Sequence, residues 1–212
     1  MNVYFYKIKG RSEGGIMKKS AKDRIRTRIN RHGVGWIFSA QDFMPEFKRY
    51  EIDASLKSLA DAGAIRKICR GIYDNPPYSD LLKQHTAPDL YGVAQTFAAK
   101  FRWQIYPSGN TALNFFGLST QIPTQLVFIS SGPNKKLETE FGSILFKHSA
   151  LRETSFRYME SGLTVWALRE IGQANLTEEI IQRIKSKFSE EFLKKIQRDI
   201  VSTANWIQQA IA

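Results

Sequence analysis

Apolar side chains recur at helical spacing near the start of the chain. Ile25 and Ile29 lie four residues apart within residues 18–32, and Gly33 follows. Apolar residues three and four positions apart share one face of a helix, and glycine favours the position just beyond a helix end. The pattern therefore predicts a first helix over residues 18–32.

Two further helices and a hairpin are predicted directly after it. A short helix is predicted over the segment AQDFMPEF after Ser39, and a longer one over residues 50–62, whose apolar residues have helical spacing. Residues 64–68 and 70–73 are short apolar segments around a tight turn, which predicts two paired strands. Three helices followed by a hairpin are typical of a winged helix-turn-helix, which we expect over residues 18–76.

The rest of the chain mixes strand and helix patterns. Strands are predicted over residues 103–106, 125–130 and 144–148. Helices are predicted over residues 110–116, 163–171, 177–187 and 189–209, with Ser108, Thr177 and Ser189 as N-caps. The fold class is therefore α+β: an N-terminal winged helix-turn-helix followed by a mixed α/β C-terminal domain that ends in helices.

The chain divides into four parts on these patterns. We expect residues 1–17 to be an extension and residues 18–76 to be the winged helix-turn-helix domain. Residues 77–100 form a linker region whose segment LYGVAQTFAAKF is helical, and residues 101–212 form the C-terminal domain.

Charge favours a polyanionic partner. The formal net charge is +11, and residues 18–75 carry thirteen basic and seven acidic side chains, a net charge of +6 on about a quarter of the chain. Basic side chains that neutralise phosphates release counterions, which drives binding to nucleic acid. The predicted winged helix-turn-helix is thus the part best suited to bind double-stranded DNA.

Candidate DNA contacts follow from the surfaces that this fold would leave exposed. The helix over residues 50–62 would enter the major groove through the face opposite its apolar stripe, and the hairpin would contact phosphates or the minor groove. The candidate DNA-binding residues are Lys48, Arg49, Tyr50, Lys57, Ser58, Arg66, Lys67 and Arg70. The acidic residues Glu51, Asp53 and Asp61 on the same helix favour sequence-specific binding over uniform adhesion to phosphate.

Other classes of protein are disfavoured. Cys69 is the single cysteine, so there is no internal disulfide and no multi-thiolate metal site. No apolar segment is long enough to span a bilayer, and we expect a cytoplasmic protein without a membrane partner. The histidines are scattered at His32, His85 and His148. We therefore expect no catalytic residue, no metal and no cofactor.

Two alternatives stay open. A metal-dependent nuclease would use acidic residues and a lysine on adjacent strands, and Glu138, Glu140 and Lys147 lie in a suitable neighbourhood without the usual spacing. A stand-alone transcriptional regulator would instead carry a ligand-sensing C-terminal domain.

Two segments resemble a known family. The region from Arg31 to Asn75, with Phe43 and the segment ASLKSLADAGAIRKICRGIY at 54–73, is similar to the winged helix of AbiEi-type antitoxins of bacterial type IV toxin-antitoxin systems. The segment YPSGNTALNFFGLSTQIPTQLVFISSG at 106–132 resembles a second part of those antitoxins, in which a small-residue turn leads into a helix and a hydrophobic strand.

The resemblance implies a function for each half of the chain. The winged helix would repress its own operon by binding repeats at the promoter. A palindromic site would require a dimer on DNA or two protomers side by side. The C-terminal domain would counteract a nucleotidyltransferase-like toxin without forming a stable complex with it.

Overall fold

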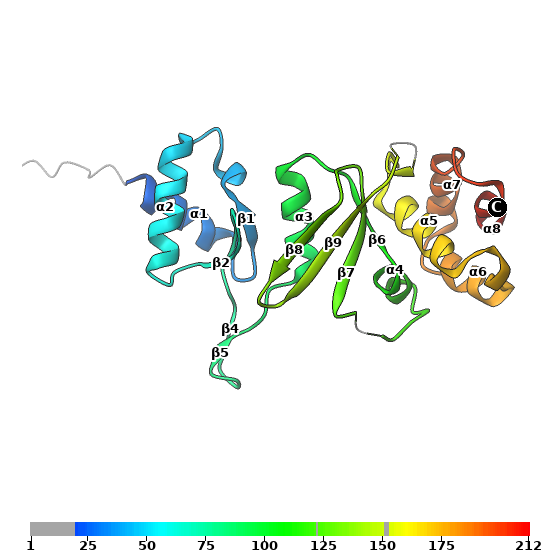
Figure 1. Cartoon of the computed structure of the whole chain (residues 1–212), viewed down its shortest axis with the longest axis horizontal. Helices are drawn as coiled ribbons and strands as arrows, with labels where there is room; N and C mark the ends of the chain where they lie inside the picture. The colour runs from blue at the N-terminus through cyan, green and yellow to red at the C-terminus, as the bar shows by residue number, and fades with distance from the viewer. Residues whose placement is uncertain (1–19, 122, 151–152) are drawn as a thin grey trace, which may run out of the picture.

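The protein is a mixed α+β chain, and the computed structural model describes residues 20–121, 123–150 and 153–212 (Figure 1). Its N-terminal elements are α1 (Ala21–His32), β1 (Ile37–Ser39), the 3₁₀ helix η1 (Ala40–Phe43), α2 (Arg49–Asp61), β2 (Arg66–Cys69) and β3 (Ile72–Asp74). A small hairpin, β4 (Tyr78–Ser79) and β5 (Gln84–His85), leads to α3 (Leu90–Lys100). The predicted extension over residues 1–17 lies outside the described residues.

A four-stranded sheet and a group of helices complete the chain. The sheet strands are β6 (Ile105–Ser108), β7 (Gln125–Ser130), β8 (Lys135–Thr139) and β9 (Gly142–His148). The helices are α4 (Asn110–Phe115), α5 (Met159–Ile171), the 3₁₀ helix η3 (Gln173–Asn175), α6 (Glu178–Lys185), α7 (Glu190–Asp199) and α8 (Asn205–Ile211). Among the described helices, none is both long and apolar enough to span a membrane.

The N-terminal elements share one core. The sheet has the strand order β1-β3-β2 and is antiparallel throughout. The fully buried side chains of Ile25 and Ile29 on α1 pack with Phe38 on β1 and with Ile52 and Leu56 on α2. The apolar stripes predicted for these two helices therefore face each other and one side of the sheet.

Capping residues and glycines in the sequence mark the ends of these helices. Ser20 caps α1 by accepting a hydrogen bond from the Asp23 amide at 3.1 Å. The helix predicted over residues 50–62 is α2, which is followed by Gly63 with a φ of +68°. Only glycine adopts such a backbone at little cost.

Several details of the local structure differ from the sequence predictions. Strand β1 was not predicted, because three residues are too few to show a period. The helix expected over AQDFMPEF is the single 3₁₀ turn η1, which ends before Pro45. The helix expected over residues 189–209 is broken into α7 and α8, because the buried Ile200 and the residues after it turn the chain.

Helix α3 lies between the three-stranded N-terminal sheet and the four-stranded sheet (Figure 1). Phe97 on α3 stacks on Phe146 of β9 with ring centroids 5.4 Å apart, and both belong to a core that also contains Ile68 of β2 and Ile72 of β3. The far side of the N-terminal sheet is thus covered by α3, so the predicted linker region supplies part of a core shared by the regions on either side of it.

The four-stranded sheet has the order β6-β7-β9-β8, with β7 and β9 parallel and the other pairs antiparallel. Strand β7 covers the predicted residues, but β8 was missed because it has one apolar residue among five. A charged strand of this kind is typical of a sheet edge. Ser108 lies in β6, and the residue before α4 is Gly109, so the predicted cap at Ser108 is wrong.

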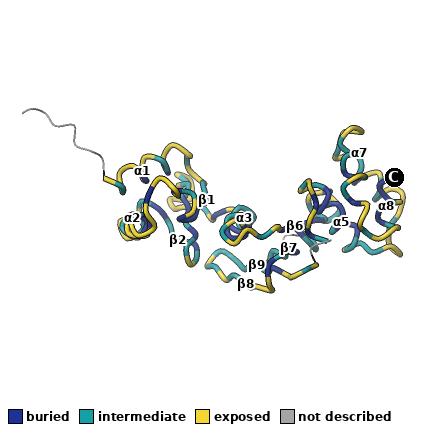
Figure 2. Tube along the Cα trace, turned by 90° about the horizontal axis from the view of Figure 1, so that it is seen from above, coloured by how far each residue is buried: buried dark blue, intermediate teal, exposed yellow. Residues whose placement is uncertain are grey.

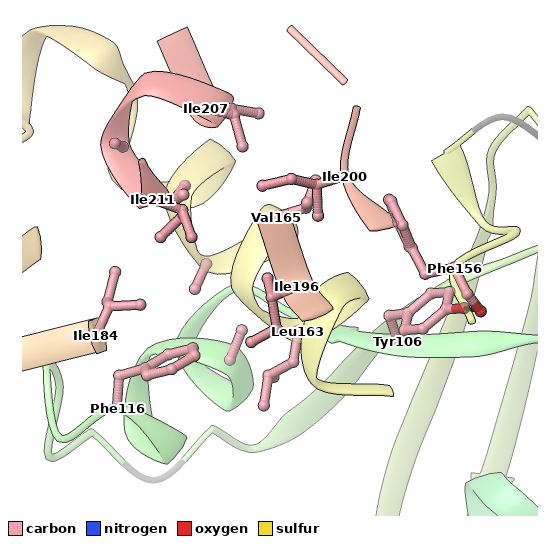
Figure 3. Packing of buried hydrophobic residues seen from close by; sticks show 14 residues of the cluster. Tyr106, Phe116, Phe156, Leu163, Val165, Ile184, Ile196, Ile200, Ile207 and Ile211 are labelled. Carbon is pink, nitrogen blue, oxygen red and sulfur yellow. Dashed lines mark hydrogen bonds between the residues drawn. The ribbon is translucent and has the colours of Figure 1, made fainter. Parts of the chain in front are cut away.

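The terminal helices pack around a third core (Figure 3). Tyr106 of β6 reaches into it, and its hydroxyl donates hydrogen bonds to the carbonyl oxygens of Thr154 and Phe156 at 3.2 Å. Asp199 of α7 accepts hydrogen bonds from the amides of Arg157 and Tyr158, both at 3.0 Å. A carboxylate from α7 therefore holds the backbone directly before α5 and joins the two helices.

Candidate nucleic-acid interface

The polar face of α2 lies at one end of the molecule. The stripe formed by Ile52, Leu56 and Leu59 is buried, and α2 is exposed along its outer side (Figure 2). The predicted residues Lys48, Arg49, Tyr50 and Lys57 are exposed on it, and Ser58 is half-buried. Tyr50 is 67% exposed, so its ring is accessible on this face of the helix.

Acidic residues on α2 have identifiable contacts. Glu51 accepts a hydrogen bond from the Lys48 amide at 3.0 Å and so caps the start of the helix. Asp53 forms an ion pair with Arg49, four residues earlier, at 2.8 Å. Both members of that pair are more than half exposed, so the pair contributes little to stability and can be exchanged for another partner.

Strand β3 brings the hairpin close to the polar face of α2. Lys67 of β2 lies directly opposite Tyr73 of β3, and the two side chains share the sheet face toward the helices. Burial raises the pKa of Tyr73, the carboxylates of Asp53 and Asp61 raise it further, and Arg49 opposes them. Tyr73 therefore stays neutral near pH 7, beside an exposed group of mixed charge that includes Lys67.

Arg66 has a different environment from the one predicted. Its Nε and Nη2 atoms donate to the two carboxylate oxygens of Asp74 at 3.1 and 2.6 Å, and Nη1 donates to the Thr86 carbonyl oxygen at 2.9 Å. The guanidinium also lies over the Phe141 ring, 4.6 Å from its centroid. Arg66 is 17% exposed and Asp74 is fully buried, so Arg66 holds the fold together and is not free to contact phosphate.

The turn between β2 and β3 carries the last predicted residue, Arg70, which is exposed. Lys100 at the end of α3 donates a hydrogen bond to the Arg70 carbonyl oxygen at 3.4 Å, which connects the turn to α3. Burial raises the pKa of the neighbouring Cys69 thiol despite the charges of Lys100 and Lys67. The thiol is therefore protonated, and the turn presents Arg70 as its charged group.

We use the term α2 surface for the exposed predicted residues together. The α2 surface consists of Lys48, Arg49, Tyr50, Lys57, Lys67 and Arg70.

Two basic features beside the α2 surface were not among the DNA contacts predicted from the sequence. Lys22 of α1 donates to the Ser58 hydroxyl at 3.4 Å, which places a further cation at the edge of the α2 surface. Arg24, Arg28 and Arg31 line a hollow of about 210 Å³ next to the turn between η1 and α2. The spacing of these arginines, four and then three residues, was the available signal, since it places them on one helix face.

The arginine hollow also contains an acidic residue. Glu46 accepts from Arg24 at 2.6 Å and from Arg28 at 3.3 Å. Arg24 in addition lies over the Phe47 ring, 4.7 Å from its centroid. These contacts fix Arg24 and Arg28 against the turn, and the three arginines and one glutamate leave the hollow with a net positive charge.

Comparison with known proteins identifies the family. A family model described as a family of unknown function, DUF6088, matches residues 24–198. The chain belongs to DUF6088. No curated protein matches this DUF6088 chain.

The solved structures similar to this DUF6088 chain include the RV2827C protein from Mycobacterium tuberculosis. The two share 12% sequence identity with a TM-score of 0.45, and the match covers 90% of this chain and 80% of that one. This similarity is too low to carry an argument about function.

The residues suggested for a nuclease do not form a site in this DUF6088 protein. Glu138 of β8 lies opposite Ser143 of β9 and forms an ion pair with Lys136. Lys147 lies four residues farther along β9, about 13 Å away at the rise of a β-strand. Within the described ranges, no group of three histidine, cysteine or acidic residues is placed to hold a metal ion.

The three histidines likewise have separate surroundings. His32 stacks on Trp36 with ring centroids 3.9 Å apart, and His85 packs against Tyr78 at 5.4 Å. The Nδ1 atom of His148 lies 2.9 Å from the Gly132 carbonyl oxygen. Each imidazole therefore has a local packing or hydrogen-bonding contact of its own, far along the chain from the other two.

Proposed function

We propose that this protein binds double-stranded DNA in a sequence-specific manner through a winged helix-turn-helix formed by α1 to β3. The observation that carries the proposal is the division of α2 into two faces. One face is buried in the N-terminal core, and the other presents Arg49, Tyr50 and Lys57. The element order and the strand order β1-β3-β2 support the same interpretation, with η1 and α2 as the helix-turn-helix and the β2–β3 hairpin as the wing.

The side chains of the α2 surface suit such a complex. An α-helix fits the major groove of B-form DNA, where an arginine donates two hydrogen bonds to guanine. Arg49 can leave its exposed ion pair with Asp53 and donate hydrogen bonds to a guanine instead. Asp53 can then accept a hydrogen bond from the amino group of a cytosine. Lys67 and Arg70 of the wing, together with the arginine hollow, are suited to phosphates.

The proposal is tested with a gel shift of the full chain on its own upstream DNA and on a scrambled duplex. We expect Arg49→Ala and Lys57→Ala to lower the affinity for the upstream DNA by about 1–3 kcal/mol each where the residue contacts a base. Lys67→Ala should weaken binding to all sequences alike. It should also reduce the slope of the logarithm of the binding constant against the logarithm of the salt concentration by about one. The matched control is Lys187→Ala, an exposed lysine between α6 and α7.

Two results would contradict the proposal. One is equal affinity of wild type, Arg49→Ala and Lys57→Ala for the upstream DNA. The other is binding that does not distinguish the two duplexes and disappears at the higher of two salt concentrations, because electrostatic attraction alone behaves in that way. Parallel reactions with magnesium report on cleavage, which would favour the nuclease alternative.

We further propose that the protein is an autorepressing antitoxin that counteracts a nucleotidyltransferase-like toxin, on the basis of the resemblance of residues 54–73 and 106–132 to AbiEi-type antitoxins. Co-expression with a toxin encoded beside it should restore growth. Arg49→Ala with Lys57→Ala should still restore growth while losing repression, since neutralisation is assigned to the C-terminal domain. Repression without any rescue would instead favour the stand-alone regulator.

A further inference from the structure

The arginine hollow holds a carboxylate between two guanidinium groups. One oxygen of Glu46 accepts a hydrogen bond from Nη2 of Arg24 at 2.6 Å, and the other accepts from Nη1 of Arg28 at 3.3 Å. A phosphate presents a pair of acceptor oxygens to arginine in the same way as a carboxylate. Glu46 therefore occupies the place that an oxyanion of a ligand would take.

Other contacts position the same two arginines. The guanidinium of Arg24 lies over the ring of Phe47, 4.7 Å from its centroid, and that of Arg28 lies over the ring of Phe43 at 5.5 Å. Both rings are buried in the N-terminal core. Cation–π contacts of this kind do not depend on Glu46, so they keep both guanidinium groups in position for another anion.

The hollow has both the charge and the room for such an anion. Arg31 and Thr27 complete its lining, so three arginines surround one glutamate. Its volume is about 210 Å³. A water molecule takes about 30 Å³ in the liquid, so a phosphate group fits in this space. The side chains of Arg24, Arg28 and Glu46 are 46%, 37% and 42% exposed, and ion pairs as exposed as these are weak enough to exchange.

The hollow lies at the end of the molecule where α1 and α2 pack together (Figure 2). Glu46 comes three residues before Arg49, the first residue of α2. A chain extends by at most about 3.6 Å per residue, so the Cα atoms of Glu46 and Arg49 lie within about 11 Å of each other. One strand of DNA has a phosphate about every 3.4 Å along the helix axis. A strand that meets α2 at Arg49 therefore has further phosphates within reach of the hollow.

We propose that the arginine hollow binds one phosphate of the DNA backbone, and that Glu46 is an internal competitor that occupies Arg24 and Arg28 in the free protein. This inference rests on the proposed DNA binding and adds to it a residue that opposes it. When DNA docks, the phosphate replaces the carboxylate at both guanidinium groups. The competition lowers the affinity for every DNA sequence, so DNA that lacks base contacts with the α2 surface is released more readily.

The first test applies the gel shift of the full chain to the upstream and the scrambled duplex. Glu46→Gln keeps the size of the side chain and removes its charge. It should raise the affinity for both duplexes by about threefold to tenfold, the range expected for one or two exposed ion pairs. The matched control is Asp61→Asn, which makes the same change of charge at the exposed last residue of α2 and should change the affinity by less than about twofold, because salt screens exposed charges.

A double-mutant cycle assigns the effect to the hollow. Arg24→Ala with Arg28→Ala should lower the affinity for both duplexes alike, and adding Glu46→Gln to this variant should give no further gain. A carboxylate that acted only through its charge at a distance would still oppose DNA binding without the two arginines. Urea unfolding shows whether each variant is folded, and Arg28→Gln replaces the double arginine variant if that one is not.

The inference is overturned if Glu46→Gln leaves the affinity unchanged, if Asp61→Asn raises it equally, or if the gain persists without the two arginines. Binding of inorganic phosphate that is lost in Arg28→Gln, with the DNA affinity of that variant unchanged, would assign the hollow to a free anion and also overturn it. Failure of the proposed function has a different signature: the wild type does not distinguish the two duplexes, yet Glu46→Gln still raises the affinity for both through the arginines. A wild type that binds neither duplex would overturn both proposals.

Discussion

Replacing Asp74 with alanine should lower the free energy of unfolding by about 3–5 kcal/mol, because it leaves the Arg66 guanidinium without its counter-ion in a mostly buried position. Asp74 is fully buried and accepts two hydrogen bonds from Arg66, its direct partner across the β2–β3 ladder. The same arginine anchors Thr86 at the base of the β4–β5 hairpin. Urea unfolding of the full chain, followed by circular dichroism, measures the change.

Two controls separate burial from charge in this experiment. Asp53→Ala removes an ion pair whose members are both more than half exposed, and it should change the free energy of unfolding by less than about 1 kcal/mol. The double variant Arg66→Met with Asp74→Leu should be less destabilised than Asp74→Ala, because no charge is left unpaired. Equal stability of Asp74→Ala and the wild type would contradict a structural role for this pair.

Replacing Phe146 with alanine should cost about 3–5 kcal/mol, the range typical of a fully buried aromatic side chain. Phe146 stacks on Phe97 of α3 at 5.4 Å, and its ring lies 5.9 Å from Trp103 and 6.0 Å from Phe128. It therefore occupies the centre of the core that joins α3 to both sheets. The loss should appear in thermal and in urea unfolding.

A conservative change at the same position provides the control. Phe146→Leu keeps an apolar side chain and should cost clearly less than Phe146→Ala, since a smaller cavity is left. Because Ile68 and Ile72 of the N-terminal sheet share this core, Phe146→Ala should lower the unfolding midpoint of both parts of the chain together. A separate early transition of the four-stranded sheet, with the N-terminal elements unchanged, would show that the two parts fold independently.

The shared core also bears on how the α2 surface is studied. A fragment that ended at residue 76 would expose Ile68 and Ile72, whose partners lie on α3 and β9. Binding experiments are therefore best made with the full chain.

Much of the local structure could be predicted from the amino-acid sequence. The spacing of Ile52, Leu56 and Leu59 and the glycine that follows defined α2 to within a residue, and the polar face predicted from that spacing is the exposed one. The strand over residues 125–130 and the caps at Thr177 and Ser189 were likewise local signals. Such features depend on neighbours within one or two turns, and the sequence alone determines them.

Other features were decided only by the tertiary structure. Arg66 looks like a free cation in the sequence, and it is the pairing of β2 with β3 that places a buried carboxylate against it. The break between α7 and α8, the position of α3 between two sheets and the distance between Glu138 and Lys147 also depend on long-range packing. Periodicity shows which face of an element is apolar, but which surface covers that face, and which charge meets which, is settled only when distant segments come together.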